Sequence, residues 1–173
     1  MKENWKPSLA AVLRSEGGND DDPADHGGRT SRGITQREYD AWRAEKGLPH
    51  KDVWTAPQSD VETIYHDEYW WPYCDLLPIG ADYEVFNTNV LAGAHRSAIL
   101  LQRALGVKDD GRIGPVTRQA IARADPVTLA NNFAAQSAAF YKSLNQPKFT
   151  RGWLNRVAFV RATALAMIRK GAR

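Results

Sequence analysis

An all-α fold with at most one small hairpin is the class that the sequence predicts. Helical periodicity is the first observation, because Leu9, Val12 and Leu13 fall on one apolar face. The second is that glycine or proline ends the periodic segments just before a new helix-start signal. The third is size, since 173 residues, 43% of them apolar, can bury one sizeable core or two small subdomains that share one.

Helices are expected in close succession along the chain. The first, with the apolar face described above, ends at a glycine pair, which suits a left-handed cap. Thr35 and Glu38 have capping-box spacing and open the second helix, and Thr55 and Gln58 repeat that spacing before the third. After the first helix, the expected ranges are 35–46, 57–70, 82–92, 94–105, 115–124, 126–144 and 150–169.

Two halves are expected, with a boundary near residues 76–81, where Pro78 and Gly80 interrupt the helical pattern. Residues 1–80 would form the first domain and residues 81–173 a helical module packed tightly on it. No flexible, low-complexity linker separates them. We therefore expect the two to fold together, as a monomer.

The charge pattern limits the classes of partner. The formal net charge of +3 favours anionic partners, among them nucleic acid, anionic lipid and the bacterial cell wall. The basic residues are scattered apart from a modest cluster at the C-terminal end, and no nucleic-acid recognition motif is present. We expect no nucleic-acid partner.

The expected compartment follows from what the chain lacks. The single cysteine, Cys74, excludes an intrachain disulfide and fits synthesis in a reducing compartment. The N-terminus has no apolar core of signal-peptide length, and no segment approaches the ~20 apolar residues of a membrane span. We expect synthesis in a host cytoplasm.

His26 and His66 lack the spacing of a zinc site, so neither a metal nor a cofactor is expected.

The segment of clearest chemical interest contains Glu16, Asp25 and Thr30. Glu16 is expected at the C-terminal end of the first helix, where the negative end of the helix dipole disfavours a carboxylate. Partial burial against aromatic side chains would also raise its pKa, and a carboxylic acid that keeps its proton can protonate a glycosidic oxygen. If the polar loop folds back as a hairpin, Asp25 and Thr30 can face Glu16 and assist water or an oxocarbenium-like transition state.

These residues also have simpler interpretations. A glutamate before two glycines at a helix end is usually a solvated side chain, and loop aspartates usually form turns. Asp20–Asp22 and Asp25 could instead bind calcium, although they lack the regular alternation and closing glutamate of an EF-hand loop. Spacing alone leaves these alternatives open.

Residues 13–35 resemble the sequence pattern of glycoside hydrolase family 108, whose members are N-acetylmuramidases. That pattern is Glu-Gly-Gly, a variable stretch, Asp-Pro-Ala-Asp-x-Gly-Gly-x-Thr and then Gly-Ile-Thr. The spacing of the acidic residues and the threonine is also similar to the Glu/Asp/Thr arrangement of phage-type lysozymes. The matching residues are Glu16-Gly17-Gly18, Asp22-Pro23-Ala24-Asp25, Gly27-Gly28, Thr30 and Gly33-Ile34-Thr35.

The C-terminal half is similar to the peptidoglycan-binding module that usually accompanies this domain. In related modules the neighbourhood of residues 109–115 helps to hold the stem peptide of the wall, although backbone geometry alone also explains its glycines. We expect Arg112 and Trp153 to contribute to wall binding. The matching residues are Leu100-Leu101-Gln102-Arg103-Ala104-Leu105-Gly106-Val107, Asp110-Gly111, Ile113-Gly114-Pro115, Thr117 and the closing motif Gly152-Trp153-Leu154-Asn155-Arg156.

The resemblance covers nearly the whole chain and implies a lysozyme-like helical domain followed by a helical wall-binding module. It implies hydrolysis of the β-1,4 bond between N-acetylmuramic acid and N-acetylglucosamine, with Glu16 as the acid and no cofactor. A phage endolysin released through a holin-made lesion fits this activity, as does a bacterial secretion-associated muramidase. The alternatives are a lytic transglycosylase on the same bond and a wall-binding protein without turnover.

Three positions depart from the family pattern. Arg32 stands where an aromatic residue is common, Asn87 where an aspartate is frequent, and Leu91 where an asparagine is frequent. None of them touches Glu16. They put in doubt a family role for these positions and bear on the wall chemotype that is recognised.

Aromatic residues and the last helix complete the candidate contacts. Trp70, Trp71 and Tyr73 could stack on sugar rings, and packing between the two halves is the structural alternative. The final helix combines an apolar face with basic side chains, so it could contact an anionic membrane surface. Burial of that face in the core is the simpler interpretation.

Overall fold

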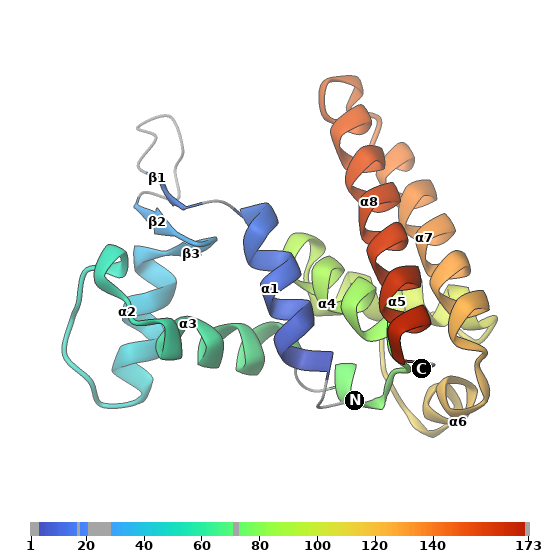
Figure 1. Ribbon diagram of the computed structural model, residues 1–173, viewed down its shortest axis with the longest axis horizontal. Helices are drawn as coiled ribbons and strands as arrows, with labels where there is room; N and C mark the ends of the chain where they lie inside the picture. The colour runs from blue at the N-terminus through green and yellow to red at the C-terminus, as the bar shows by residue number, and fades with distance from the viewer. Residues whose placement is uncertain (1–3, 17, 21–28, 71–72, 172–173) are drawn as a thin grey trace. The chain divides into compact units, whose positions relative to one another are not determined.

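The computed structural model describes residues 4–16, 18–20, 29–70 and 73–171, and most of them are helical (Figure 1). The predicted all-α class is confirmed. The β structure is slightly larger than one hairpin, because three strands of two residues each pair in the order β1-β2-β3. The α-helices are α1 (Trp5–Glu16), α2 (Gln36–Glu45), α3 (Gln58–Ile64), α4 (Ala81–Ala92), α5 (Ala94–Leu105), α6 (Pro115–Arg123), α7 (Pro126–Ser143) and α8 (Pro147–Gly171).

The chain divides into two compact units. One comprises Lys6–Glu68, and the other comprises Met1–Trp5 together with Tyr69–Arg173. We call them the N-terminal unit and the C-terminal unit. None of the helices in the described ranges is long and apolar enough to cross a membrane.

The N-terminal unit places a small antiparallel sheet between α1 and α2 in sequence. Its strands are β1 (Asn19–Asp20), β2 (Thr30–Ser31) and β3 (Ile34–Thr35). The predicted start of α2 is confirmed, because the Thr35 hydroxyl accepts from the Glu38 amide while the Glu38 carboxylate accepts from the Thr35 amide. The apolar core of this unit includes Leu9, Val12, Ile34, Tyr39, Val53, Val61 and Ile64, which are all buried.

The expected capping pair Thr55 and Gln58 is wrong. Thr55 lies in the short 3-10 helix η2 (Val53–Thr55), and its hydroxyl donates to the Asp52 carbonyl at 2.8 Å. α3 therefore begins after Pro57 without a side-chain cap. The helix then continues to Trp70 as a π-helix, η3 (Tyr65–Trp70), so that the predicted range 57–70 contains two kinds of helix.

The C-terminal unit is built around α4. Every residue from Ala81 to Asn89 is buried, and α5, α7 and α8 all contact this helix. Such a helix is enclosed on all sides, in contrast to a surface helix with one apolar face. Several of its buried residues are polar, namely Asp82, Glu84, Asn87, Thr88 and Asn89.

Local signals set the other helix ends of this unit. Gly106 adopts the left-handed conformation at the end of α5, with φ 69°. The Asp125 carboxylate accepts from the Thr128 amide at 2.8 Å and caps α7. α8 begins at Pro147, slightly earlier than the predicted 150, and it runs beside α7 (Figure 1). A short 3-10 helix, η4 (Cys74–Leu76), precedes α4.

Candidate active site

The polar loop after Glu16 folds back as the sequence analysis suggested. α1 ends at Glu16, and β1 pairs antiparallel with β2 so that Asp20 lies opposite Thr30. The amide of Arg32 donates to the Gly18 carbonyl at 3.0 Å, which extends this pairing toward α1. The strand that contains Thr30 therefore runs beside the segment that directly follows Glu16. Asp25 lies in the connection between β1 and β2, outside the described residues.

The turn between β2 and β3 is fixed by Arg32. Arg32 and Gly33 both have positive φ, 51° and 80°, as in a type I′ hairpin turn. The Arg32 guanidinium donates to the Ala56 carbonyl at 2.6 Å and to Oε1 of Gln58 at 3.1 Å. Its own carbonyl accepts from the Tyr65 hydroxyl at 2.7 Å. Arg32 thus ties the sheet to the start of α3.

Trp54 and Asp52 hold the other side of β2. The indole Nε1 of Trp54 donates to the Thr30 carbonyl at 3.0 Å. The Arg29 guanidinium lies 4.1 Å from the centre of the Trp54 ring and forms an ion pair with Asp52 at 2.8 Å. Because Asp52 also accepts from the Trp54 amide at 2.9 Å, these residues form one connected support for the strand.

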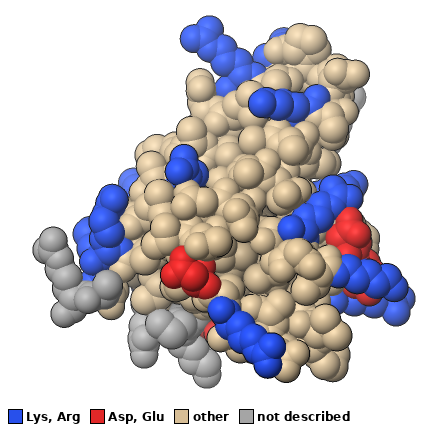
Figure 2. Space-filling view, turned by 90° about the vertical axis from the view of Figure 1, so that its right-hand side faces the viewer, with Lys and Arg blue, Asp and Glu red and all other residues tan. Residues whose placement is uncertain are grey.

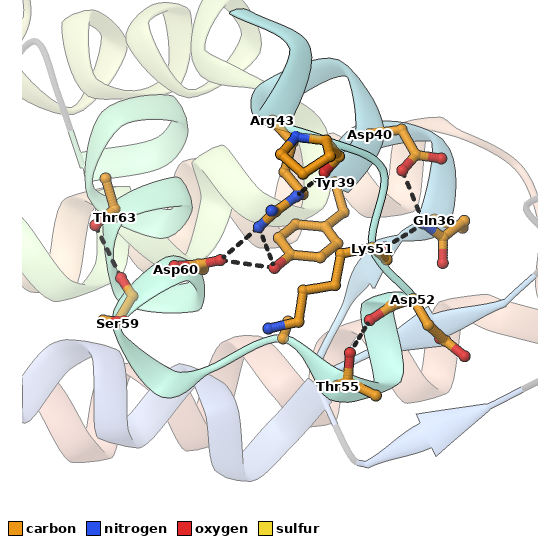
Figure 3. A network of polar contacts seen from close by, with 12 residues as sticks. Gln36, Tyr39, Asp40, Arg43, Lys51, Asp52, Thr55, Ser59, Asp60 and Thr63 are labelled. Carbon is orange, nitrogen blue, oxygen red and sulfur yellow. Dashed lines mark hydrogen bonds and ion pairs between the residues drawn. The ribbon is translucent and has the colours of Figure 1, made fainter. Parts of the chain in front are cut away.

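Gln36 links this support to the first turn of α2. Its backbone amide donates to the Arg29 carbonyl at 2.8 Å. Its side-chain nitrogen, Nε2, donates to the Lys51 carbonyl at 2.9 Å (Figure 3). Its side-chain oxygen accepts from the Val53 amide at 2.8 Å. Gln36 thus connects the segment before Thr30, through its backbone amide, to the loop that presents Asp52, through its side chain.

A second polar cluster connects α2 to α3. The Tyr39 hydroxyl donates to Asp60 at 2.6 Å, and the Arg43 guanidinium donates to the same hydroxyl at 3.2 Å (Figure 3). Arg43 also donates to the Pro49 carbonyl at 2.6 Å. Burial and the adjacent Asp60 raise the pKa of Tyr39. The sequence analysis gave Tyr39, Arg43 and Asp60 no role, because Asp60 lies 21 and 17 residues from its two partners.

The aromatic candidates for sugar stacking are mostly buried. Trp70 is 1% exposed, and its ring contacts those of Trp5 and Phe86 edge-on, with ring centres 5.3 and 5.5 Å away. Tyr73 is 5% exposed, and its hydroxyl donates to the Ala94 carbonyl at 2.9 Å. Both side chains pack within the C-terminal unit, and a role of either in sugar stacking stays a prediction. Trp71 lies outside the described residues.

The predicted wall-binding turn is organised by Gln102. This side chain is 1% exposed and donates to Asp110 at 2.9 Å and to the Arg112 carbonyl at 3.0 Å. It accepts from the Gly111 amide at 2.7 Å, and Gly111 has φ 73°. The Arg112 side chain is exposed beside this rigid turn.

Figure 2 shows a face of the molecule on which Lys and Arg are widely spread and Asp and Glu gather in few places, which suits an anionic polymer.

The apolar residues of the last helix, α8, are only partly buried. Val160 and Ala164 of α8 are buried, while Phe159 is 54% exposed. Trp153 is half-buried, and its ring lies 5.3 Å from that of Tyr141, centre to centre. The burial of part of α8 fits the simpler interpretation of its apolar residues, and contact with an anionic membrane stays a prediction.

In the parts of the chain that the structure describes, no group of three or more His, Cys, Asp or Glu side chains could hold a metal ion.

Comparison with known proteins gives two family matches and a structural one. Residues 9–93 match the family described as Glycosyl hydrolase 108, and residues 96–158 match one described as Predicted Peptidoglycan domain. The solved structure of Brucella abortus SagA is similar, with 30% sequence identity, full coverage of both chains and a TM-score of 0.82. None of the curated proteins compared matches the chain.

Proposed function

Because this chain belongs to the glycosyl hydrolase 108 family and has a C-terminal peptidoglycan-binding domain, it is a peptidoglycan-degrading glycosyl hydrolase, and we propose that it is an N-acetylmuramidase. In this proposal it hydrolyses the β-1,4 bond between N-acetylmuramic acid and N-acetylglucosamine. The observation that supports it most directly is the position of Glu16 at the end of α1, beside a folded-back hairpin.

Glu16 is proposed to donate the proton to the bridging oxygen. The C-terminal end of an α-helix presents partial negative charge, which favours the neutral, proton-bearing form of a carboxyl group. Two glycines follow Glu16, so that bulky side chains do not restrict the approach of a polymeric substrate there. Protonation of the leaving oxygen is the step that a glycosidase needs from such a group.

The hairpin is proposed to supply the second part of the site. Thr30 lies on a strand held by Trp54, Arg32 and Gln36, so its position is fixed by several independent contacts. We propose that its hydroxyl helps to hold the attacking water. Asp25, in the connection of the same hairpin, is proposed to assist that water or to stabilise the oxocarbenium-like transition state.

Product analysis distinguishes the proposed reaction from its alternatives. Purified peptidoglycan is digested with the full chain, and the fragments are identified by mass spectrometry. Reducing muramic ends are expected for a hydrolase, whereas anhydromuramic ends would indicate a lytic transglycosylase. Intact sacculi that retain bound protein would show a wall-binding protein without turnover, and would overturn the proposal.

The C-terminal unit is proposed to hold the wall while the N-terminal unit cuts it. Arg112 is exposed on a turn fixed by Gln102, and Trp153 is half-buried on α8. Substitution of either should reduce retention on purified sacculi in a pull-down. The biological setting that we propose is that of a lysis enzyme of the endolysin type, which reaches the wall through a holin-type lesion. Lysis only upon co-expression with a holin would support that setting.

A further inference from the structure

The excess of positive charge in this chain comes from its last 48 residues. Residues 126–173 contain eight Lys or Arg side chains and no Asp or Glu. The preceding 125 residues contain the other 15 basic side chains and all 20 acidic ones. α7 and α8 make up nearly all of the acid-free segment and pack against each other. Such a separation of charge directs the basic helical hairpin toward an anionic surface.

The turn between α7 and α8 is the most exposed part of this hairpin. Every residue from Lys142 to Phe149 is exposed, and in Figure 1 the turn lies at the end of the two helices that is farthest from the C-terminus. We call residues 142–151 the hairpin tip. Its cations Lys142, Lys148 and Arg151 form no ion pair with any described residue. Figure 2 shows blue side chains and no red ones on the upper end of the molecule, where α7 and α8 meet.

Large apolar side chains are exposed between these cations. Leu144 is 38% exposed and Phe149 is 49% exposed. The Lys148 ammonium lies 5.3 Å from the centre of the Phe149 ring, whose centre is 5.8 Å from that of Trp153. A soluble polyanion attracts the cations but offers no apolar layer to these side chains. The boundary between lipid headgroups and acyl chains accepts both kinds of group, so the combination favours a membrane surface.

An open groove on the hairpin tip adds hydrogen-bond donors. It has a volume of about 560 Å³ and runs along the turn and the first turns of α8. Lys142 and Arg151 line it together with the side-chain amides of Asn145, Gln146 and Asn155. All five can donate to the oxygens of a phosphate group, and the guanidinium can do so through two parallel hydrogen bonds. The groove therefore suits the phosphodiester of a lipid headgroup.

We propose that the hairpin tip docks on the surface of an anionic phospholipid bilayer. The contact is made by the turn and not by the apolar face of α8, in which Val160 and Ala164 are buried. Each Lys or Arg close to an anionic membrane strengthens binding by about fivefold, so three cations together contribute about a hundredfold. Because these cations are exposed, the interaction is reversible and weakens as salt is added. The proposal goes beyond hydrolysis of the wall and does not depend on it.

Co-sedimentation with vesicles tests the proposal without any cell-wall material. The full chain is titrated with vesicles of phosphatidylglycerol and phosphatidylcholine in equal parts, and with vesicles of phosphatidylcholine alone. We expect binding to the mixed vesicles at least about tenfold tighter than to the neutral ones. Equal affinity for the two, or no binding to the mixed vesicles, would overturn the proposal. Because the vesicles hold no peptidoglycan, failure of the muramidase proposal leaves this result unaffected.

A matched pair of double variants locates the charged part of the surface. Lys142→Gln/Arg151→Gln should bind the mixed vesicles at least about tenfold more weakly than the wild type. Arg169→Gln/Lys170→Gln removes the same charge from exposed positions at the other end of α8 and should stay within about threefold of the wild type. Equal losses in the two variants would show attraction by net charge alone, and would contradict docking by the hairpin tip.

Apolar variants distinguish a bilayer from a soluble polyanion. Phe149→Ser and Leu144→Ser should each weaken vesicle binding by about fivefold with little change in melting temperature, because both side chains are exposed. Phe159→Ser is the control, since Phe159 is 54% exposed farther along the same helix. Wild-type vesicle binding by both tip variants would identify a surface for polyanions and overturn the proposal.

Retention on purified sacculi separates lipid binding from a further contact with the wall. Lys142→Gln/Arg151→Gln should be retained on sacculi as the wild type is, and should digest them at the same rate. A loss of sacculus retention that equals its loss of vesicle binding would assign the hairpin tip to an anionic wall polymer, and the lipid proposal would be wrong.

Discussion

Replacement of Glu84 by glutamine should stabilise the protein, and the gain should grow with pH. Glu84 is 2% exposed on α4, and burial raises its pKa from 4.5 to about 9. Glutamine has nearly the same size and shape but cannot ionise. The variant therefore removes the coupling between folding and proton uptake at this position while it preserves the packing around α4.

The magnitude follows from proton linkage. Between pH 4.5 and about 9 the native state keeps the Glu84 proton and the unfolded state releases it. Fewer protons are then bound in the unfolded state, so the free energy of unfolding falls by about 1.4 kcal/mol for each pH unit. From about pH 5 to about pH 7 the wild type should lose about 3 kcal/mol relative to Glu84→Gln.

Urea denaturation of both proteins at several pH values measures this difference. The other ionisable groups are common to the two proteins, so their contributions largely cancel in the comparison. We expect the difference in unfolding free energy to increase steadily from about pH 5 to about pH 8. A difference that does not depend on pH would show that Glu84 titrates normally in the folded protein, and the account of its burial would be wrong.

Three further substitutions test the supports of the two units. Trp54→Phe keeps a ring for Arg29 but removes the indole donor to Thr30, so activity on sacculi should fall about fivefold, with a melting temperature within a few degrees of wild type; unchanged activity would remove Trp54 from the support of the site. Gln102→Leu removes the hydrogen bonds of Gln102 to Asp110, Gly111, Arg112 and Thr117 and should lower the free energy of unfolding by about 3 kcal/mol in urea titration. Gly80→Ala should cost at least about 2 kcal/mol in the same assay, because φ is 93° and the new methyl group would lie 2.7 Å from Ile168.

Features set by short-range interactions could be predicted from the sequence. The Thr35–Glu38 capping box, the left-handed Gly106 and the Asp125 cap each depend on residues within a few positions of one another. Such signals place a helix end when no other group competes for the same atoms. The order of the helices and the all-α class followed from them.

Local signals failed where another group competed for the same atoms. The Thr55 hydroxyl bonds to the Asp52 carbonyl within a 3-10 turn and is not available to cap α3. The π-helical geometry of Tyr65–Trp70 was also not predicted, since it leaves the apolar pattern nearly unchanged. Trp70 itself is a case in which residue type suggested sugar stacking, while edge-on contacts with Trp5 and Phe86 account for its position.

The candidate residues of the site could be proposed from the sequence, but the contacts that hold their strand in place could not. Glu16 and Thr30 were identified from residue type, spacing and resemblance. The contacts that hold β2 join Arg29 to Asp52 and Thr30 to Trp54, across more than 20 residues of sequence. Such pairings depend on how α2 and the loop after it fold, which no short motif specifies.

The central claim is that Glu16 is the proton donor, and Glu16→Gln tests it most directly. Glu45→Gln is the matched control, because Glu45 is also the last residue of a helix and is exposed. Release of reducing muramic ends from purified peptidoglycan is measured by mass spectrometry for both variants and the wild type. With melting curves unchanged, we predict at least about a 100-fold loss for Glu16→Gln and wild-type release for Glu45→Gln. Wild-type product release from a folded Glu16→Gln protein would contradict the account.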